Sequence, residues 1–350
     1  MKIAHIIPHF HGIGGVQVCV HNISERHARK GHDVRVFCRK NHSNPGLSYK
    51  KEPFLHFRFT PRTFPIGKWW MSHYITRLQN KHQFDVWQIN GGYPYGILLG
   101  DFFSTKIPCV LRCSGEDIQV DLESNYGVRL KPVLDRSIKK DYKKLSTYVA
   151  ITETVRQEYI KIGIPDKKIK IIPNGVDFKR ISGATGTNDI RKQYNLPEPA
   201  KVILTVGRNH PKKGCRFISE ILKQILSQGV DAYWIVVGKG SARIPGIEVL
   251  KGDLDRIICV EAISFDTDGY EIPSDKLIRY YKSADVFAMP SHIETFGIVL
   301  IEAMAAGLPV VCFDVPGVRD VMNTKCGTAC ELGDIDSFAH ALNRIWGNLR

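Results

Sequence analysis

Short apolar segments alternate with longer amphipathic segments along the whole chain. In the first half, apolar runs of strand length occur at residues 3–7, 34–38, 86–90, 108–113, 147–151 and 170–172. The intervening segments, such as residues 16–30, have the periodicity of helices that bury one face. Strands that alternate with helices in this way predict a parallel sheet built from right-handed βαβ units.

A second series of apolar runs begins after residue 200. Its members are residues 202–206, 234–237, 257–261, 286–289 and 310–313. The stretch before it, residues 182–199, is rich in Gly, Thr, Asn and Pro, which is typical of a connecting segment. We therefore expect an α/β protein with two Rossmann-like, doubly wound parallel-sheet domains that face a central cleft. The predicted limits are 1–178 for the first domain, 179–199 for the linker and 200–350 for the second domain.

One segment of the second half, SHIETFGIVLIEAMAAGLPVV, combines this alternation with two acidic residues. Residues 284–290 predict a strand, residues 298–306 a helix closed by Gly307, and residues 308–313 the next strand. Glu294 and Glu302 lie eight residues apart on either side of the helix start. At the helical rise of about 1.5 Å per residue, that spacing corresponds to roughly 12 Å, near the reach from a sugar to the ribose of its carrier nucleotide.

The start of this helix is also suited to an anion. Backbone N–H groups around Phe296, Gly297 and Ile298 would point at a diphosphate between the two acids, and the helix dipole favours negative charge there. The alternative is that one Glu is an ordinary helix-start acid and the other a solvated one. The small residues around them, including the AMAAG run, favour a turn with room for a ligand.

These residues resemble a known family, the retaining glycosyltransferases of the GT-B fold, family 4, whose motif is E-x7-E. Further matching segments are GIGGVQ, YVAITETVRQ, IIPNGVD, VGRNHPKKG and SADVFAMPS. The resemblance implies that Glu294 contacts the donor sugar and is the catalytic residue to test first, and that Glu302 contacts the ribose. It also implies that Arg208 and Lys213 bind the diphosphate.

Transfer from a nucleotide sugar needs positive charge aimed at the departing diphosphate. Arg208 and Lys213 follow a predicted strand, and guanidinium and ammonium groups both bind phosphates. The alternative is a basic surface loop. In the other half of the chain, Gly12, Gly14 and Gly15 form a loop that can present backbone N–H groups to the same ligand.

The glycine loop does not match a nicotinamide-binding fingerprint, because Gln17 stands where the last glycine is needed, and a dehydrogenase is disfavoured. Three Asp-x-Asp pairs would be candidates for a metal-dependent transferase. We interpret them as solvated turns and expect no metal, with activity that persists in EDTA. The pairs are Asp253/Asp255, Asp266/Asp268 and Asp334/Asp336.

The net charge of +14 belongs entirely to the first half. Residues 1–175 hold 28 Lys or Arg against 14 Asp or Glu, whereas residues 176–350 hold 21 of each. A basic first domain fits nucleic acid, an anionic membrane surface or an anionic acceptor. The segment 64–84 mixes aromatic and basic residues, as an interfacial helix or an ordinary packed amphipathic helix would.

No run approaches 18 uninterrupted apolar residues, and the opening MKIAHIIP is too short for a secretory signal. We expect a cytoplasmic protein, with a peripheral position at the inner face of the membrane as one interpretation of the basic half. The nine Cys are scattered and fit small buried thiols.

The acceptor side is less defined by sequence. Where many family members carry a His, this chain has Ser114 in RCSGEDIQ, and Ser114 and Asp117 are the acceptor-side candidates. Glu116, His9 and His11 are further candidates by loop position. For each of them the alternative is a surface polar or satisfied loop residue.

The sequence thus predicts a retaining glycosyltransferase that moves a sugar from a UDP- or GDP-sugar to a cell-envelope glycan or lipid-linked acceptor. A nucleotide-sugar epimerase of the same fold is one alternative, and it would need no acceptor. A non-catalytic protein that binds nucleic acid or another anionic polymer is the other. No nucleic-acid partner is expected, because the chain has no helix-turn-helix spacing, zinc-finger ligands or aromatic RNA-binding motif.

Overall fold

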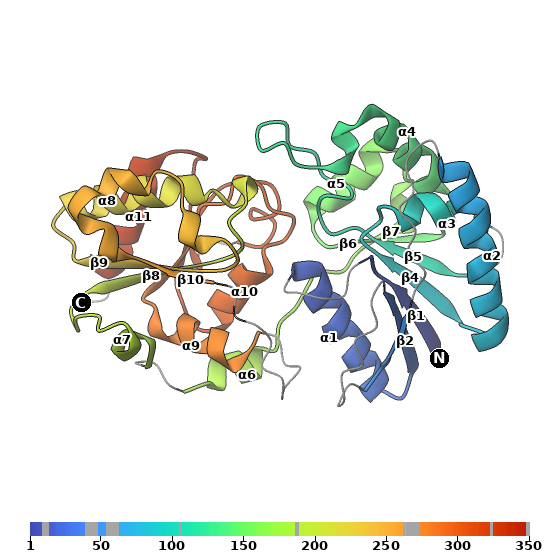
Figure 1. Cartoon of the computed structure of the whole chain (residues 1–350), viewed down its shortest axis with the longest axis horizontal. Helices are drawn as coiled ribbons and strands as arrows, with labels where there is room; N and C mark the ends of the chain where they lie inside the picture. The colour runs from blue at the N-terminus through green and yellow to red at the C-terminus, as the bar shows by residue number, and fades with distance from the viewer. Residues whose placement is uncertain are drawn as a thin grey trace. The chain divides into compact units, whose positions relative to one another are not determined.

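The chain folds as two compact units, Met1–Asn174 and Gly175–Arg350 (Figure 1). The computed structural model describes residues 1–8, 14–38, 48–53, 63–104, 107–185, 189–261, 263, 273–322 and 325–347. Among these residues, no helix is both long enough and apolar enough to cross a lipid bilayer.

The first unit is built on a seven-stranded sheet in which every neighbouring pair is parallel. The strand order is β3-β2-β1-β4-β5-β6-β7, so the direction of winding reverses between β1 and β4. The strands are β1 (Lys2–Ile6), β2 (Asp33–Cys38), β3 (Lys50–Pro53), β4 (Val86–Asn90), β5 (Cys109–Arg112), β6 (Thr147–Ala150) and β7 (Ile169–Ile171).

Helices cover both faces of this sheet, which explains why the central strands are apolar on both sides (Figure 1). Helix α1 lies on one face, and α2 and α3 lie on the other (Figure 1). The helices of the unit are α1 (Gly15–Arg29), α2 (Phe64–His82), α3 (Tyr95–Phe103), α4 (Pro132–Asp141) and α5 (Glu153–Lys161). The Thr152 side chain caps α5 by accepting a hydrogen bond from the Val155 amide at 3.2 Å.

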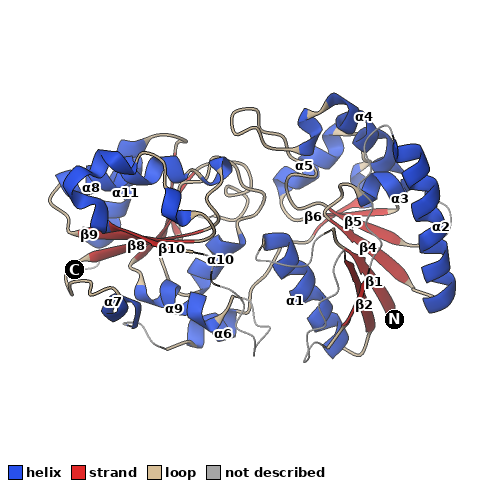
Figure 2. Cartoon of the chain, viewed as in Figure 1, coloured by secondary structure: helices blue, strands red, loops and turns tan. Residues whose placement is uncertain are grey.

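The second unit has a six-stranded parallel sheet of order β10-β9-β8-β11-β12-β13. Figure 2 shows its strands with helices packed around them. Here the winding reverses between β8 and β11. The strands are β8 (Lys201–Val206), β9 (Ala232–Val237), β10 (Ile257–Val260), β11 (Val286–Met289), β12 (Val310–Phe313) and β13 (Gly327–Cys330). The helices are α6 (Phe178–Gly183), α7 (Asp189–Gln193), α8 (Ile218–Ser227), α9 (Asp275–Ser283), α10 (Ile298–Ala305) and α11 (Ile335–Gly347).

The core of the second unit is dominated by its sheet. Trp234 is fully buried, and its indole Nε1 donates to the Thr205 hydroxyl at 2.9 Å. That hydroxyl in turn donates to the Ala288 carbonyl oxygen at 2.6 Å. This chain of hydrogen bonds satisfies the polar atoms that β8 and β9 carry into the core.

The apolar runs of the sequence predict eleven of the strands within two residues, and β4 agrees end for end. Two strands were not predicted, β3 with the sequence KKEP and β13 with GTAC. Both lie at the edge of a sheet, where a strand pairs on one side only. Unlike the edge strands β7 and β10, these two have polar or small residues and so carry no apolar run.

The segment predicted as a linker, residues 179–199, belongs to the second unit. It contains most of α6 and all of α7. Ile181 packs against Ile278 and Ala305, and Ile190 joins the main core of the unit. These apolar contacts attach the segment to the second unit.

Candidate donor site in the second unit

The loops that follow β8 and β11 bring two predicted site residues together. Lys213 ends a single 3-10 turn, Pro211–Lys213, after β8, and Glu294 follows β11. The Lys213 Nζ donates a hydrogen bond to Glu294 Oε1, forming an ion pair. The two strands are neighbours at the position where the winding reverses, and open parallel sheets bind ligands at the carboxyl ends of such strands.

Backbone contacts hold these two loops in register. The carbonyl oxygen of Lys212 accepts hydrogen bonds from the amides of His292 and Ile293, at 2.8 and 3.3 Å. Gly214 has φ +64°, and a Cβ there would lie 1.7 Å from the Pro290 carbonyl oxygen. The close approach of the loops therefore requires a residue without a side chain at position 214.

Glu294 is buried with only 5% of its surface exposed, yet it is ionised. Burial raises the pKa of the Glu294 carboxyl, but the charges of Lys213 and Lys212 outweigh this effect. Hydrogen bonds from Lys213 and from the Thr295 backbone act in the same direction, and the pKa falls to about 2. A carboxylate held in this state accepts hydrogen bonds from hydroxyl groups or stabilises positive charge, and it has no proton to donate.

Glu302 lies in the second turn of α10 and is also buried, with 3% exposed. Its Oε2 accepts a hydrogen bond from the Tyr281 hydroxyl of α9 at 2.8 Å. Burial raises the pKa of Glu302 to about 7, against the lowering effects of the Tyr281 hydrogen bond and the Arg180 charge. The two glutamates of the motif therefore differ in protonation, because only Glu294 has an ion-pair partner.

The predicted separation of roughly 12 Å between the two glutamates assumed eight helical residues, and the backbone between them is not helical throughout. Only Ile298–Glu302 of the interval is helical, because α10 begins at Ile298. Those four steps account for about 6 Å of rise. The remaining residues form a loop that turns at Gly297, which has φ +74° and has no side chain with which to cap α10. Phe296, next to it, is buried with 5% exposed.

Arg208 lies on the same loop as Lys213, two residues after β8, and its side chain is exposed. The loop between them is tied to a neighbouring one by the Asn209 amide, which donates to the Lys239 carbonyl oxygen at 2.8 Å. His210 accepts from the Lys212 amide through Nδ1 at 3.3 Å. Burial, followed by the charges of Arg208, Lys212 and Lys213, lowers the pKa of His210, so this loop presents a cluster of positive charge.

Three participants in the site were not predicted from sequence. Tyr281 and Arg180 act on Glu302, and Lys212, which is 9% exposed, acts on Glu294. Tyr281 belongs to the apolar face of an amphipathic helix, which gives no sign of a polar role. Lys212 adjoins Lys213 in the sequence, and only the fold shows that the two ammonium groups influence the same carboxylate.

The first unit contains the remaining predicted residues. Gly14 is the N-cap of α1 and Gly15 its first residue, while Gly12 lies outside the described residues. Asp117 accepts hydrogen bonds from the amides of Gly92 at 2.6 Å, Ser114 at 3.0 Å and Gly115 at 2.9 Å.

Three amides donate to this one buried carboxylate, so Asp117 holds the loop after β5 in place. This agrees with the alternative given above, in which Asp117 is a structural residue of the loop. Ser114 is half-buried beside it, and Glu116 is exposed. His9 and His11 lie outside the described residues.

One of the Asp-x-Asp pairs has a local structural role. Asp334 accepts a hydrogen bond from the Ser337 amide at 2.9 Å at the start of α11. Asp253 and Asp255 are exposed, and the pair at 266 and 268 lies outside the described residues. Within the described part of the chain, no three His, Cys, Asp or Glu side chains are grouped as metal ligands.

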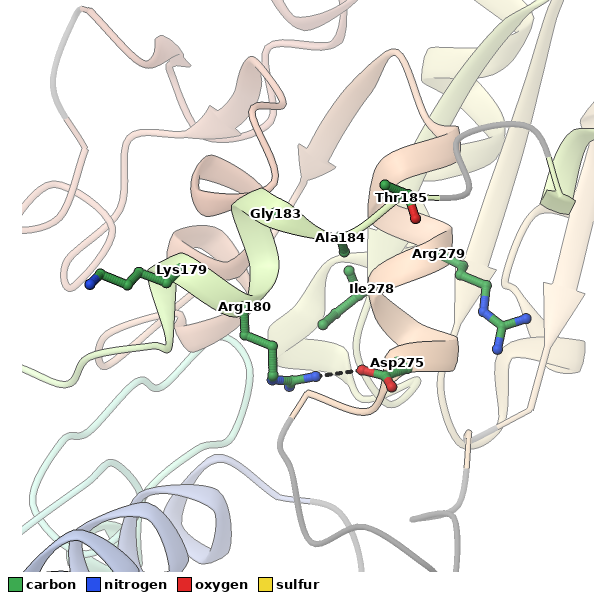
Figure 3. Close-up of a pocket in the computed structure, with 8 residues that line it drawn as sticks. All are labelled: Lys179, Arg180, Gly183, Ala184, Thr185, Asp275, Ile278 and Arg279. Atoms are coloured by element: carbon green, nitrogen blue, oxygen red, sulfur yellow. Dashed lines mark hydrogen bonds and ion pairs between the residues drawn. The ribbon is translucent and has the colours of Figure 1, made fainter.

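A cavity of about 460 Å³ opens between α6 and α9 (Figure 3). Arg180 and Asp275 point toward one another there as an ion pair, whereas Lys179 and Arg279 extend away on opposite sides (Figure 3). None of its lining residues comes from the loops after β8 and β11. The cavity is therefore a feature separate from the Lys213–Glu294 pair.

The raised pKa of Glu302 predicts a pH-dependent cost to folding. The folded state holds its proton up to about pH 7, whereas the ordinary value is 4.5. Stability is therefore full below pH 4.5 and is lost as the pH rises through 7. We expect Glu302→Gln to remove this loss. Relative to the wild type, the variant should gain about 2 kcal/mol in its free energy of unfolding between pH 5 and pH 8, which means that it is the more stable protein at the higher pH.

The measurement is urea-induced unfolding at both pH values, with Glu220→Gln on the exposed face of α8 as the control. The control should show no such pH dependence. A stability difference for Glu302→Gln that is equal at both pH values would contradict the assignment of a buried, protonated carboxyl.

Comparison with known proteins agrees with this geometry. Residues 13–180 match the sequence model of Glycosyltransferase Family 4, and residues 200–348 match that of Glycosyl transferases group 1. N-acetyl-alpha-D-glucosaminyl L-malate synthase from Bacillus anthracis is 21% identical over 353 residues, covering 97% of this chain and 86% of the relative. UDP-Gal:alpha-D-GlcNAc-diphosphoundecaprenol alpha-1,3-galactosyltransferase from Escherichia coli is 28% identical over 63% of this chain and 58% of the relative.

Other relatives are matched over about half their length. An uncharacterized glycosyltransferase from Methanocaldococcus jannaschii is 29% identical, and the match covers 58% of this chain and 53% of the relative. D-inositol 3-phosphate glycosyltransferase from Kineococcus radiotolerans is 32% identical, and the match covers 49% of this chain and 40% of the relative.

Among solved structures, HepE from Anabaena in complex with UDP-glucose has a TM-score of 0.76, with 17% identity, and the match covers 100% of this chain and 90% of that one. This similarity shows the fold. The two sequence models together take in both units, and the chain belongs to the family 4, group 1 glycosyltransferases, with the GT-B fold of two Rossmann-like domains.

Proposed function

We propose that this chain is a retaining glycosyltransferase that binds the diphosphate and sugar of a nucleotide-sugar donor at the loops after β8 and β11. The observation that carries the proposal is the buried ion pair between Lys213 and Glu294 at the position where the winding of the sheet reverses. An ammonium group there can bind a diphosphate, and an ionised carboxylate beside it can accept hydrogen bonds from sugar hydroxyls.

The reaction breaks the bond between the anomeric carbon and the diphosphate oxygen and forms a bond from that carbon to an acceptor hydroxyl. Negative charge grows on the leaving diphosphate, where Lys213 and Arg208 supply positive charge. The acceptor proton passes to the leaving phosphate in a front-face reaction. In a double displacement, a carboxylate first forms a covalent sugar intermediate. In both routes Glu294 is ionised before the donor binds.

The donor is proposed to be a UDP- or GDP-sugar, and the resemblance of the fold to HepE in complex with UDP-glucose supports a uridine nucleotide first. The acceptor is proposed to be an anionic or lipid-linked cell-envelope intermediate. The names of the relatives from B. anthracis, E. coli and K. radiotolerans point to malate, a diphosphoundecaprenol lipid and an inositol phosphate, all of which carry negative charge. The excess of basic residues in the first half supports the same class.

Glu294→Gln tests the proposed role of the carboxylate. We expect kcat to fall by about 100-fold or more, because the isosteric amide cannot stabilise positive charge on the sugar, while UDP affinity changes little. Lys213→Gln should instead weaken UDP binding by about tenfold, through loss of a charge-assisted hydrogen bond.

Donors are first identified by the thermal shift that nucleotide sugars produce, and transfer is then followed as nucleotide release and as product, with EDTA present. Glu220→Gln and Lys223→Gln, both exposed on α8, are matched controls. Unchanged turnover in Glu294→Gln would remove this residue from the mechanism. A new nucleotide sugar formed without acceptor would identify an epimerase, and loss of activity in EDTA with recovery in manganese would contradict metal independence.

A second proposal concerns α2, whose exposed face fits an anionic membrane surface. Ile66 and Trp69 are 68% and 71% exposed, and the Trp69 ring stacks on His73 at 6.2 Å between centroids. Arg77 and Lys81 continue the same face at helical spacing, and the helix contains no acidic residue. Indole and basic groups on one helix face are typical of interfacial binding.

Vesicle binding tests this second proposal. The full chain should bind vesicles that contain anionic phosphatidylglycerol and should bind pure phosphatidylcholine weakly, because the basic residues need negative charge. Trp69→Ala should reduce binding to the anionic vesicles at least fivefold, as the most exposed ring of the face is lost. Phe178→Ala, on the other unit and 64% exposed, is the control. Equal binding by both variants would rule out α2 as the contact surface.

A further inference from the structure

Arg112, the last residue of β5, carries a charge into the interior of the first unit without a counter-charge. Its side chain is 4% exposed, and its Nη2 donates a hydrogen bond to the Asn174 side-chain oxygen. Its Nη1 is buried with no hydrogen-bond partner among the described residues. A guanidinium stays protonated in proteins, and a buried charge is costly unless it is compensated.

Asn90 and His5 belong to the same cluster as Arg112. Asn90, the last residue of β4, is the register partner of Arg112, and its Nδ2 lies 3.4 Å from His5 Nδ1 on β1. The Asn90 amide is oriented by Gln88, whose Nε2 donates to Asn90 Oδ1 at 2.7 Å. Its Nδ2 therefore faces the His5 ring as a donor, and Nδ1 of His5 is the acceptor.

His5 is fully buried and neutral. Burial, the neighbouring His27 and the Arg112 charge lower the pKa of His5 to about 3. Because Nδ1 accepts from Asn90, the single proton of the ring lies on Nε2. That Nε2 atom is buried with no hydrogen-bond partner. The cluster thus presents two buried N–H donors, from Arg112 and His5, for which the described residues supply no acceptor.

The cluster lies at the edge of the sheet where open parallel sheets bind ligands. Asn90 and Arg112 end adjacent strands, and β1 and β4 flank the reversal of winding, where open parallel sheets bind their ligands. The next residue, Gly91, has φ +74°, and a Cβ there would meet no atom within 4 Å. There is consequently open space beside Gly91, at the end of β4.

We propose that His5, Asn90 and Arg112 form a subsite for an oxyanion group, a carboxylate or a phosphate, on the acceptor. An oxyanion accepts hydrogen bonds from Arg112 Nη1 and His5 Nε2 and also neutralises the guanidinium, which a water molecule would leave uncompensated. The assignment to the acceptor rests on the proposed transferase function, and the anion site itself does not. A neutral acceptor would leave the Arg112 charge without a partner.

Binding of simple anions to the full chain tests the subsite. Inorganic phosphate and malonate are titrated against chloride at equal ionic strength, by calorimetry and by the imidazole ¹⁵N resonances of His5. Phosphate represents phosphate-bearing acceptors and malonate represents carboxylate-bearing ones. The anion that binds more tightly therefore identifies the group that the acceptor carries. In the wild type, the bound anion should shift the His5 resonances, because a nearby negative charge favours the protonated ring.

Arg112→Gln should weaken binding of the preferred anion at least tenfold and leave UDP affinity within twofold of the wild type. Arg136→Gln, exposed on α4 of the same unit, should change neither. Folding is checked by unfolding curves. Arg112→Gln should unfold at the same or a higher temperature in anion-free buffer, since an uncompensated buried charge is removed.

Three results would overturn the subsite: equal anion affinity in Arg112→Gln and the wild type, His5 resonances that do not respond to phosphate or malonate, or no binding of either anion above chloride. Absence of UDP binding in every variant, together with anion binding that depends on Arg112, would instead refute the donor site and leave the subsite in place.

Discussion

The contact on which the second unit's site depends is the ion pair between Lys213 and Glu294. A carboxylate that is 95% buried remains charged only beside a cation, and the cation reaches it because β8 and β11 are adjacent parallel strands. The two loops are held by paired backbone hydrogen bonds to the Lys212 carbonyl oxygen and by the missing side chain of Gly214. The position of the Glu294 carboxylate is therefore set by the two adjacent strand ends and Gly214, and its charge is maintained by Lys213.

The same unit contains a second buried glutamate, Glu302, whose pKa is shifted in the opposite direction. Glu302 has a tyrosine hydroxyl rather than an ammonium group as its partner, so burial dominates and its pKa lies near 7. Glu294 can thus accept hydrogen bonds and stabilise positive charge. Glu302 can both donate and accept hydrogen bonds at neutral pH. Two identical side chains eight residues apart acquire different chemistry from the groups that surround them, as is common in active sites.

The sequence predicted the strands that form the centre of each sheet, because a strand buried on both faces must be apolar. It did not predict β3 or β13, whose polar or small residues pair on one side only. For the candidate site, the spacing of the two glutamates and the family resemblance predicted Glu294, Glu302 and Lys213, yet the sequence could not show that Lys213 pairs with Glu294. Nor could it show that Tyr281 reaches Glu302, or that Asp117 is occupied by three amides, because these contacts join segments that only the fold brings together.

The central claim, that Lys213 and Glu294 mark the donor site, is tested most directly by determining the structure of the chain with UDP bound. The account predicts diphosphate oxygens within hydrogen-bonding distance of Lys213 Nζ, with the Glu294 carboxylate beside the position of the sugar. UDP bound away from the loops after β8 and β11, with the Lys213–Glu294 pair undisturbed, would contradict it.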